Sequence, residues 1–168
     1  MNGLLIQNTL LKQAEDRVEK TVPRAQRDNY LKIVVAGMKY AMDKGPEGVL
    51  ASLKDSKDPL SDSVHGAIGI VGGLRRNAKG TMPIAAMVPA AMTLMLHALD
   101  FAEKMKLITV TATELDNATH LFMDTIMPLL QVPKTKLDES LSQVHDILRD
   151  PDKMAQYKGQ QNGAAKLG

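Results

Sequence analysis

The feature that most limits how this chain can fold is Gly80–Leu99, a stretch of twenty residues, GTMPIAAMVPAAMTLMLHAL, without a charged side chain. A membrane-spanning helix needs about 20 predominantly apolar residues, so the stretch just reaches the length of a span. Three structures are compatible with it: a permanent membrane span, a buried helix of a folded domain, or an apolar segment that stays covered until a membrane or a partner takes it up.

The residues within the stretch favour the buried helix. Pro83 and Pro89 cannot donate backbone hydrogen bonds, a loss that lipid cannot make good, and the many alanines contribute little to membrane insertion. Basic residues precede the stretch, as they do at the cytoplasmic border of a span, but the residues that follow it are of mixed charge. We therefore predict a central apolar helix near 83–105, bent or restarted near Pro89, and keep the other two structures as alternatives.

The composition indicates an all-α protein. Aromatic residues, which favour strands, make up only 3% of the chain, whereas it contains eleven methionines and many alanines and leucines, which favour helices. We predict an irregular bundle of about five to six helices. The remaining helices follow from apolar spacing and are expected at 3–22, 24–43, 112–131 and 137–148, with short ones at 47–54 and from 151 onward.

Two local signals refine these helices. Thr111 and Glu114 have the spacing of a capping box, in which the threonine accepts from the backbone at the start of a helix and the glutamate reaches back. Four glycines, Gly66, Gly69, Gly72 and Gly73, follow a polar stretch. Each costs a helix about 1 kcal/mol relative to alanine. We expect a loop or a partly helical element there; a helix packed very closely on a neighbour and a segment that rearranges are the alternatives.

The chain is expected to form one helical domain over residues 1–150, followed by a short helix and a flexible tail at 151–168. Within the domain, the polar sequence around 55–63 is a candidate mobile connection. The N-terminal sequence lacks the basic start and continuous apolar core of a signal peptide, so secretion by that route is not expected.

Catalytic and metal-binding patterns are weak. The chain contains no cysteine, which excludes disulfides, thiolate metal sites and a cysteine nucleophile. His120 and Asp124 are four residues apart and could share a helix face that holds a cation, but a structural role is the simpler interpretation. No serine lies in a nucleophile elbow, and the glycine segment fits no nucleotide-binding fingerprint. We predict no enzyme activity, no catalytic residue, no cofactor and no metal site.

The net charge of +2 does not indicate general nucleic-acid binding. Arg75, Arg76 and Lys79 form the densest basic cluster and could grip phosphates or an acidic partner. No aromatic residue lies among them to stack on bases, so we expect no specific nucleic-acid contact. The candidate interaction or repacking segment combines this cluster with the glycines and with methionines of the apolar stretch: Gly66, Gly69, Gly72, Gly73, Arg75, Arg76, Lys79, Met87, Met92 and Met95.

Two stretches resemble small α-helical virion proteins of tailed bacteriophages. They are VGGLRRNAKGTMPIAAMVPAAMTLMLHALDFAEKM and ATELDNATHLFMDTIMPLL, within residues 71–130. The group includes head-to-tail accessory proteins and the internal proteins that short-tailed phages eject with their DNA. The resemblance transfers no functional residue.

The resemblance implies a non-enzymatic structural protein in many copies on the portal–tail axis of a virion, assembled in the bacterial cytoplasm. Its partners would be its own copies and other virion proteins, with transient membrane contact during genome delivery. Two alternatives remain from the residues. One is a bacterial helical adaptor or regulatory subunit that binds a protein partner. The other is an enzyme with a polar pocket around His120, Asp124 or Glu114.

Overall fold

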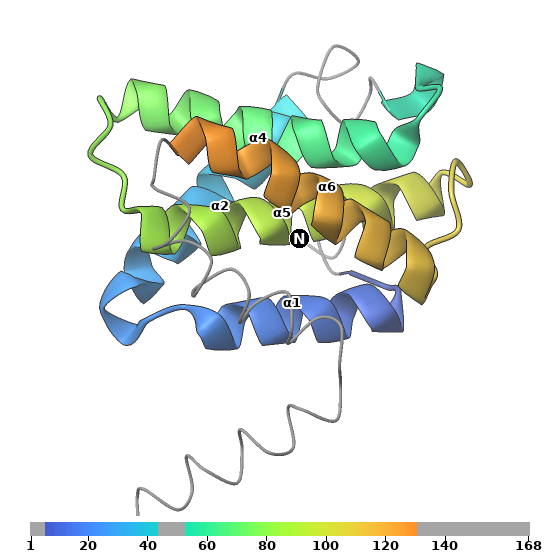
Figure 1. Ribbon diagram of the computed structural model, residues 1–168, viewed down its shortest axis with the longest axis horizontal. Coiled ribbons are helices and arrows are strands. Elements are labelled where there is room, and N and C mark those ends of the chain that lie inside the picture. The colour runs from blue at the N-terminus through green and yellow to red at the C-terminus, as the bar shows by residue number, and fades with distance from the viewer. Residues whose placement is uncertain (1–5, 44–52, 131–168) are drawn as a thin grey trace, which may run out of the picture. The chain divides into compact units, whose positions relative to one another are not determined.

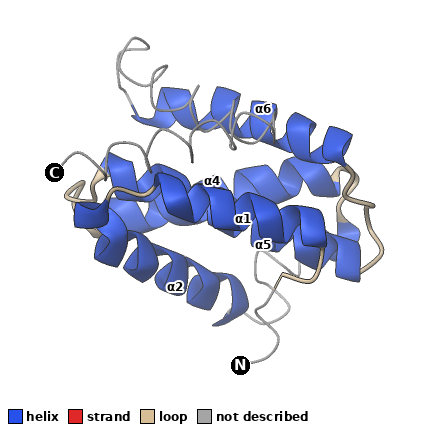
Figure 2. Cartoon of the chain, turned by 90° about the horizontal axis from the view of Figure 1, so that it is seen from below, coloured by secondary structure: helices blue, strands red, loops and turns tan. Residues whose placement is uncertain are grey.

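The computed structural model describes residues 6–43 and 53–130, and all regular elements within these ranges are helical (Figures 1 and 2). The chain divides into two compact units, Met1–Val132 and Pro133–Gly168, and the described residues belong to the first. Their α-helices are α1 (Thr9–Thr21), α2 (Arg27–Asp43), α4 (Pro59–Asn77), α5 (Ile84–Lys104) and α6 (Ala112–Leu130), with short 3₁₀ helices η1 (Arg24–Gln26) and η3 (Leu53–Asp55). The predicted all-α class is confirmed.

Helix α5 is the centre of this unit. It contacts α1, α2, α4 and α6, and Figure 1 shows it passing between α1 and α4. It is long and apolar enough to span a membrane, but 78% of its apolar window is buried in the fold. Burial of that surface drives folding, at about 25 cal/mol per Å² of apolar area. The prediction of a central apolar helix near 83–105 is confirmed.

Helix starts are set by side-chain caps. The Asn8 side chain accepts hydrogen bonds from the backbone N–H groups of Leu10 and Leu11, at 2.9 and 3.1 Å. This cap starts α1 at Thr9, later than the predicted residue 3. At α6, the Glu114 N–H donates to Thr111 Oγ1 at 3.5 Å and the threonine hydroxyl donates to the Glu114 carboxylate, which confirms a capping interaction between these two residues.

The expectation of a loop or a partly helical element at the four glycines was wrong, because α4 runs as a helix through all of them to Asn77. Asp58 caps the helix and Pro59 occupies its first turn, where a missing N–H costs nothing. Val64, Ile68 and Val71 then form a buried stripe, and burial of this stripe offsets the low helix propensity of glycine. Because α4 starts at Pro59, only residues 56–58 of the candidate connection at 55–63 lie between η3 and α4.

Helix α5 continues through Pro89 without a restart, contrary to one of the two forms predicted for it. Proline removes a single hydrogen bond, the one to the carbonyl of Ala85. Ala85 is exposed, so water can supply the missing donor. The helices predicted at 137–148 and from 151 onward, and most of the one predicted at 47–54, lie outside the described residues.

Candidate interaction site

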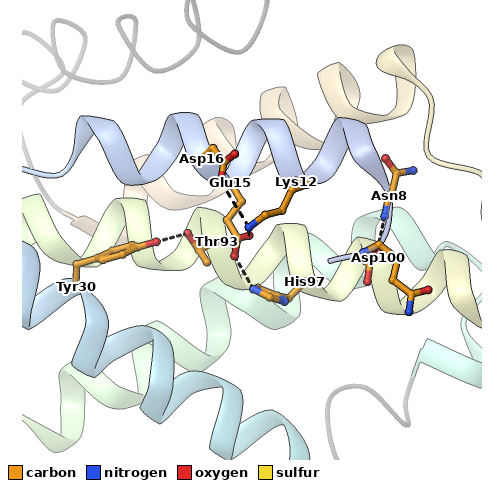
Figure 3. A network of polar contacts seen from close by, with 9 residues as sticks. Asn8, Lys12, Glu15, Asp16, Tyr30, Thr93, His97 and Asp100 are labelled. Carbon is orange, nitrogen blue, oxygen red and sulfur yellow. Dashed lines mark hydrogen bonds and ion pairs between the residues drawn. The ribbon is translucent and has the colours of Figure 1, made fainter. Parts of the chain in front are cut away.

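Besides Glu103, the largely apolar α5 carries one polar stripe, formed by Thr93, His97, Asp100 and Lys104. Their spacing of four, three and four residues places them on one face of the helix. Figure 3 shows that three of them meet polar groups of α1, α2 or the segment before α1. We call this set of contacts the polar seam.

The Asp100 end of the seam anchors the chain where it enters α1. The Asp100 carboxylate accepts hydrogen bonds from the backbone N–H groups of Gln7 and Asn8, at 2.9 and 3.1 Å, and lies 2.6 Å from Lys104 Nζ. Burial raises the pKa of Asp100, but the bonds from Lys104, Asn8 and Gln7 outweigh it and hold the pKa below its ordinary value. The ionised carboxylate is therefore the form that the fold selects.

The middle of the seam joins α1 and α2 to α5. Glu15 Oε1 lies 2.8 Å from His97 Nε2, and both side chains are largely buried. The hydrogen bond with His97 lowers the pKa of Glu15, against burial, which raises it; Lys12, 3.1 Å from Glu15, lowers it further. The Tyr30 hydroxyl lies 2.9 Å from Thr93 Oγ1 in the core, where burial raises the tyrosine pKa.

The seam is structural in character. Among the described residues, every buried side-chain nitrogen or oxygen has a hydrogen-bond partner, so the seam presents no unsatisfied group to a ligand. Of the two residues considered for a cation site, His120 forms a hydrogen bond through its ring with the Asp116 carbonyl at 2.9 Å, and Asp124 is exposed one turn further along α6. Nowhere in the described ranges do three metal-ligating side chains cluster.

A groove of about 420 Å³ lies between α4 and α6, beside the start of α5. Its apolar floor contains Ile68, Val71, Met87 and Ile126, all buried. Leu129, which is 54% exposed, stands at its edge. The remaining lining residues are Gly72, Arg75, Arg76, Lys79, Gly80 and Leu130. We call this site the basic groove.

The basic groove brings together half of the predicted interaction segment: Gly72, Arg75, Arg76, Lys79 and Met87. The other half lies elsewhere. Met92 and Met95 are buried in the core, while Gly66, Gly69 and Gly73 lie on α4 outside the groove lining. The groove combines residues of α4, α5 and α6, and its α6 residues, Ile126, Leu129 and Leu130, were not among the predicted site residues.

The glycines of α4 do not mark a close helix contact where their surroundings are described. A Cβ at Gly69 would meet no atom within 4 Å, and one at Gly72 or Gly73 would meet only Arg76, at 3.9 Å. The close approach is at Gly37 of α2, where a Cβ would collide with Leu94 Cδ1 of α5. Sequence reasoning missed Gly37, although a lone glycine inside a helical pattern is the relevant signal.

Helix α2 has a second apolar face that the described unit leaves uncovered. Its buried face contains Tyr30, Ile33, Gly37 and Ala41. The opposite face presents Leu31, Val35 and Met42, which are 47%, 67% and 45% exposed. We call these three residues the α2 stripe.

No protein-family model matches the sequence, and no curated protein or solved structure is detectably similar to it. The proposals below therefore rest on the fold, the polar seam, the basic groove and the α2 stripe.

Proposed function

We propose that the protein is a non-enzymatic structural subunit, present in many copies in the portal–tail complex of a phage virion. The observation that carries this proposal is the α2 stripe. Full burial of a Leu, Val or Met side chain contributes about 1.5–3 kcal/mol, and roughly half of that is unrealised at each stripe residue. A partner helix laid along the stripe would recover it.

The spacing of the stripe suits a helix partner. When Met38 is counted with the three stripe residues, the spacing is four, three and four residues, as in a coiled-coil seam: Leu31, Val35, Met38 and Met42. Met38 is partly buried and lies between the exposed members. This pattern supports pairing of α2 with a helix of another copy or another protein.

The proposal includes transient membrane contact during genome delivery. It is supported by α5, which has the length and apolarity of a span yet is covered in this fold. Thr93 and His97 of α5 meet Tyr30 of α2 and Glu15 of α1, and Asp100 accepts from the backbone just before α1, so release of α1 and this segment would remove these partners of His97 and Asp100. Exposure of α5 to a membrane therefore requires that His97 and Asp100 lose these hydrogen-bond partners.

A second candidate is a bacterial adaptor or regulatory subunit that binds one protein partner. The α2 stripe favours this role as well, since a helix of a different protein would cover it equally. The two candidates differ in stoichiometry. The virion role requires a ring or another high-order homo-oligomer, whereas the adaptor role requires a dimer or a discrete heterocomplex.

Native mass spectrometry of the full-length protein tests both candidates. The virion role predicts a high-order homo-oligomer that dissociates on V35K, because this change places a charge in the apolar seam. M105K is the matched control, since Met105 is 39% exposed but lies outside the stripe. A monomer across the accessible concentration range contradicts the virion proposal, and a vesicle-leakage assay without leakage at any pH contradicts its membrane component.

A further inference from the structure

The cations of the basic groove have no partner within the described part of the chain. Arg75, Arg76 and Lys79 form neither an ion pair nor a hydrogen bond through their side chains with any described residue. Arg76 and Lys79 are exposed and Arg75 is half-buried, and all three line a groove with an apolar floor. Three positive charges thus surround an opening into buried apolar surface.

These cations are not needed to cap α4. The carbonyls of Leu74, Arg75 and Arg76 accept hydrogen bonds from the backbone N–H groups of Ala78, Gly80 and Lys79, at 2.9, 3.0 and 3.0 Å. Lys79 and Gly80 adopt positive φ angles of 51° and 76° to close this turn. The backbone itself satisfies the end of the helix, which leaves the cationic groups available to a ligand.

The groove has the size and polarity of a site for an anionic amphiphile. Its volume of about 420 Å³ falls within the range of about 300–1,000 Å³ that is typical of small-molecule sites. A protein partner normally covers about 800 Å² on each side of an interface, much more than one groove of this size supplies. Guanidinium groups bind phosphate oxygens in a bidentate manner, and an apolar floor accepts a hydrocarbon chain.

We propose that the basic groove binds an anionic phospholipid of a bilayer, with the phosphate on Arg75, Arg76 and Lys79 and one acyl chain over the buried floor. The site would hold the protein at a membrane with the N-terminal turn of α5 facing the lipid, because Met87 of α5 lines the same groove. This inference deepens the membrane contact proposed above and names the lipid class. It does not depend on the oligomeric state.

The two glycines of α4 provide a matched test of the acyl-chain site. Gly72 lines the groove and Gly69 does not, and an added Cβ meets at most the Arg76 side chain at either position. G72L fills the groove and G69L leaves it open, while both changes improve helix propensity. The full-length proteins are compared by flotation with vesicles of phosphatidylcholine alone and with vesicles that also contain phosphatidylglycerol.

We expect wild type and G69L to bind phosphatidylglycerol vesicles and to bind pure phosphatidylcholine much more weakly. G72L should bind phosphatidylglycerol vesicles about tenfold or more weakly, because each methylene kept in water reduces affinity severalfold. Equal binding by G72L and G69L, with both folded by circular dichroism, would overturn the acyl-chain site. If G72L and G69L bind equally and the protein still makes vesicles leak, the proposed membrane contact stands, but the groove is not its binding site.

The headgroup part is tested with R75Q/R76Q/K79Q. Removal of each cation from an anionic surface is expected to lower binding roughly fivefold. The control is R24Q/R27Q, since Arg24 and Arg27 are an exposed basic pair outside the groove. Equal loss per charge in both variants would mean general attraction to the surface and would overturn the headgroup site. The lipid assignment would also be overturned if the protein bound neither kind of vesicle but bound an acidic protein, and if G72L abolished that binding.

Discussion

Glu15 of α1 and His97 of α5 are 82 residues apart in the chain, and their side chains meet at 2.8 Å (Figure 3). Helix α1 buries only Leu11, Ala14 and Val18. Polar contacts therefore specify where α1 lies on α5, although burial of apolar surface provides the larger free energy.

Loss of this pair should destabilise the fold. We expect E15A to lower the free energy of unfolding by about 1–3 kcal/mol, because the partly buried His97 ring loses its partner. A double-mutant cycle with H97A should give a coupling energy of about 0.5–3 kcal/mol in urea denaturation. K12A is the control and should cost about 1 kcal/mol or less, since Lys12 is exposed. A coupling energy near zero would contradict the role of the pair.

Removal of the Asp100 carboxylate should destabilise the fold more than removal of the Glu15 carboxylate. D100A leaves the N–H groups of Gln7 and Asn8 without their shared acceptor and removes the ion pair with Lys104, and we expect a cost of about 3–5 kcal/mol. Amide hydrogen exchange should show the largest loss of protection in α1, which begins beside these groups. D124A, at an exposed carboxylate, should change stability by less than about 0.5 kcal/mol. Equal effects of the two substitutions would refute this anchoring role.

Stability should fall at acidic pH through the polar seam. The folded-state pKa values of Glu15 and Asp100 lie below their ordinary values of 4.5 and 3.8, so in acid the unfolded chain binds more protons than the folded one. The contribution of both groups is complete well above pH 4.5. It declines as the pH falls through these values toward the lower folded-state pKa values.

Urea denaturation between pH 7 and pH 3 measures this decline. E15Q/D100N should be less stable than wild type at neutral pH but should lose less stability on acidification, because its amides do not titrate. Parallel pH profiles for wild type and variant would show that other carboxyl groups control the acid response.

The same substitution should have opposite effects at two glycines. G37A forces the Leu94 side chain, which is buried between α2 and α5, to move, and we expect a loss of about 1–3 kcal/mol. G69A meets open space in a regular helix and should gain about 0.5–1 kcal/mol from helix propensity. Thermal unfolding of both variants and of wild type measures the two changes in stability. Stabilisation by G37A would contradict the close approach of Gly37 to Leu94.

Much of the helical framework could be predicted from the sequence because it depends on neighbours a few residues apart. The apolar stretch that starts at Gly80 predicted a central helix, and the spacing of Thr111 and Glu114 predicted a capped start. The failure at α4 is instructive. The low helix propensity of its glycines disfavoured a helix there. However, Val64, Ile68 and Val71 pack against neighbours whose positions the local sequence does not reveal.

By itself, the sequence determined that this chain forms helices and that one of them is apolar enough to need covering on nearly every side. The tertiary structure decided what covers it: which glycine permits a close approach, which carboxylate meets His97, and which cations line the basic groove. The physical reason is that helix propensity and capping act within a turn or two. Burial, ion pairing and groove shape depend instead on side chains that the fold brings together from distant parts of the chain.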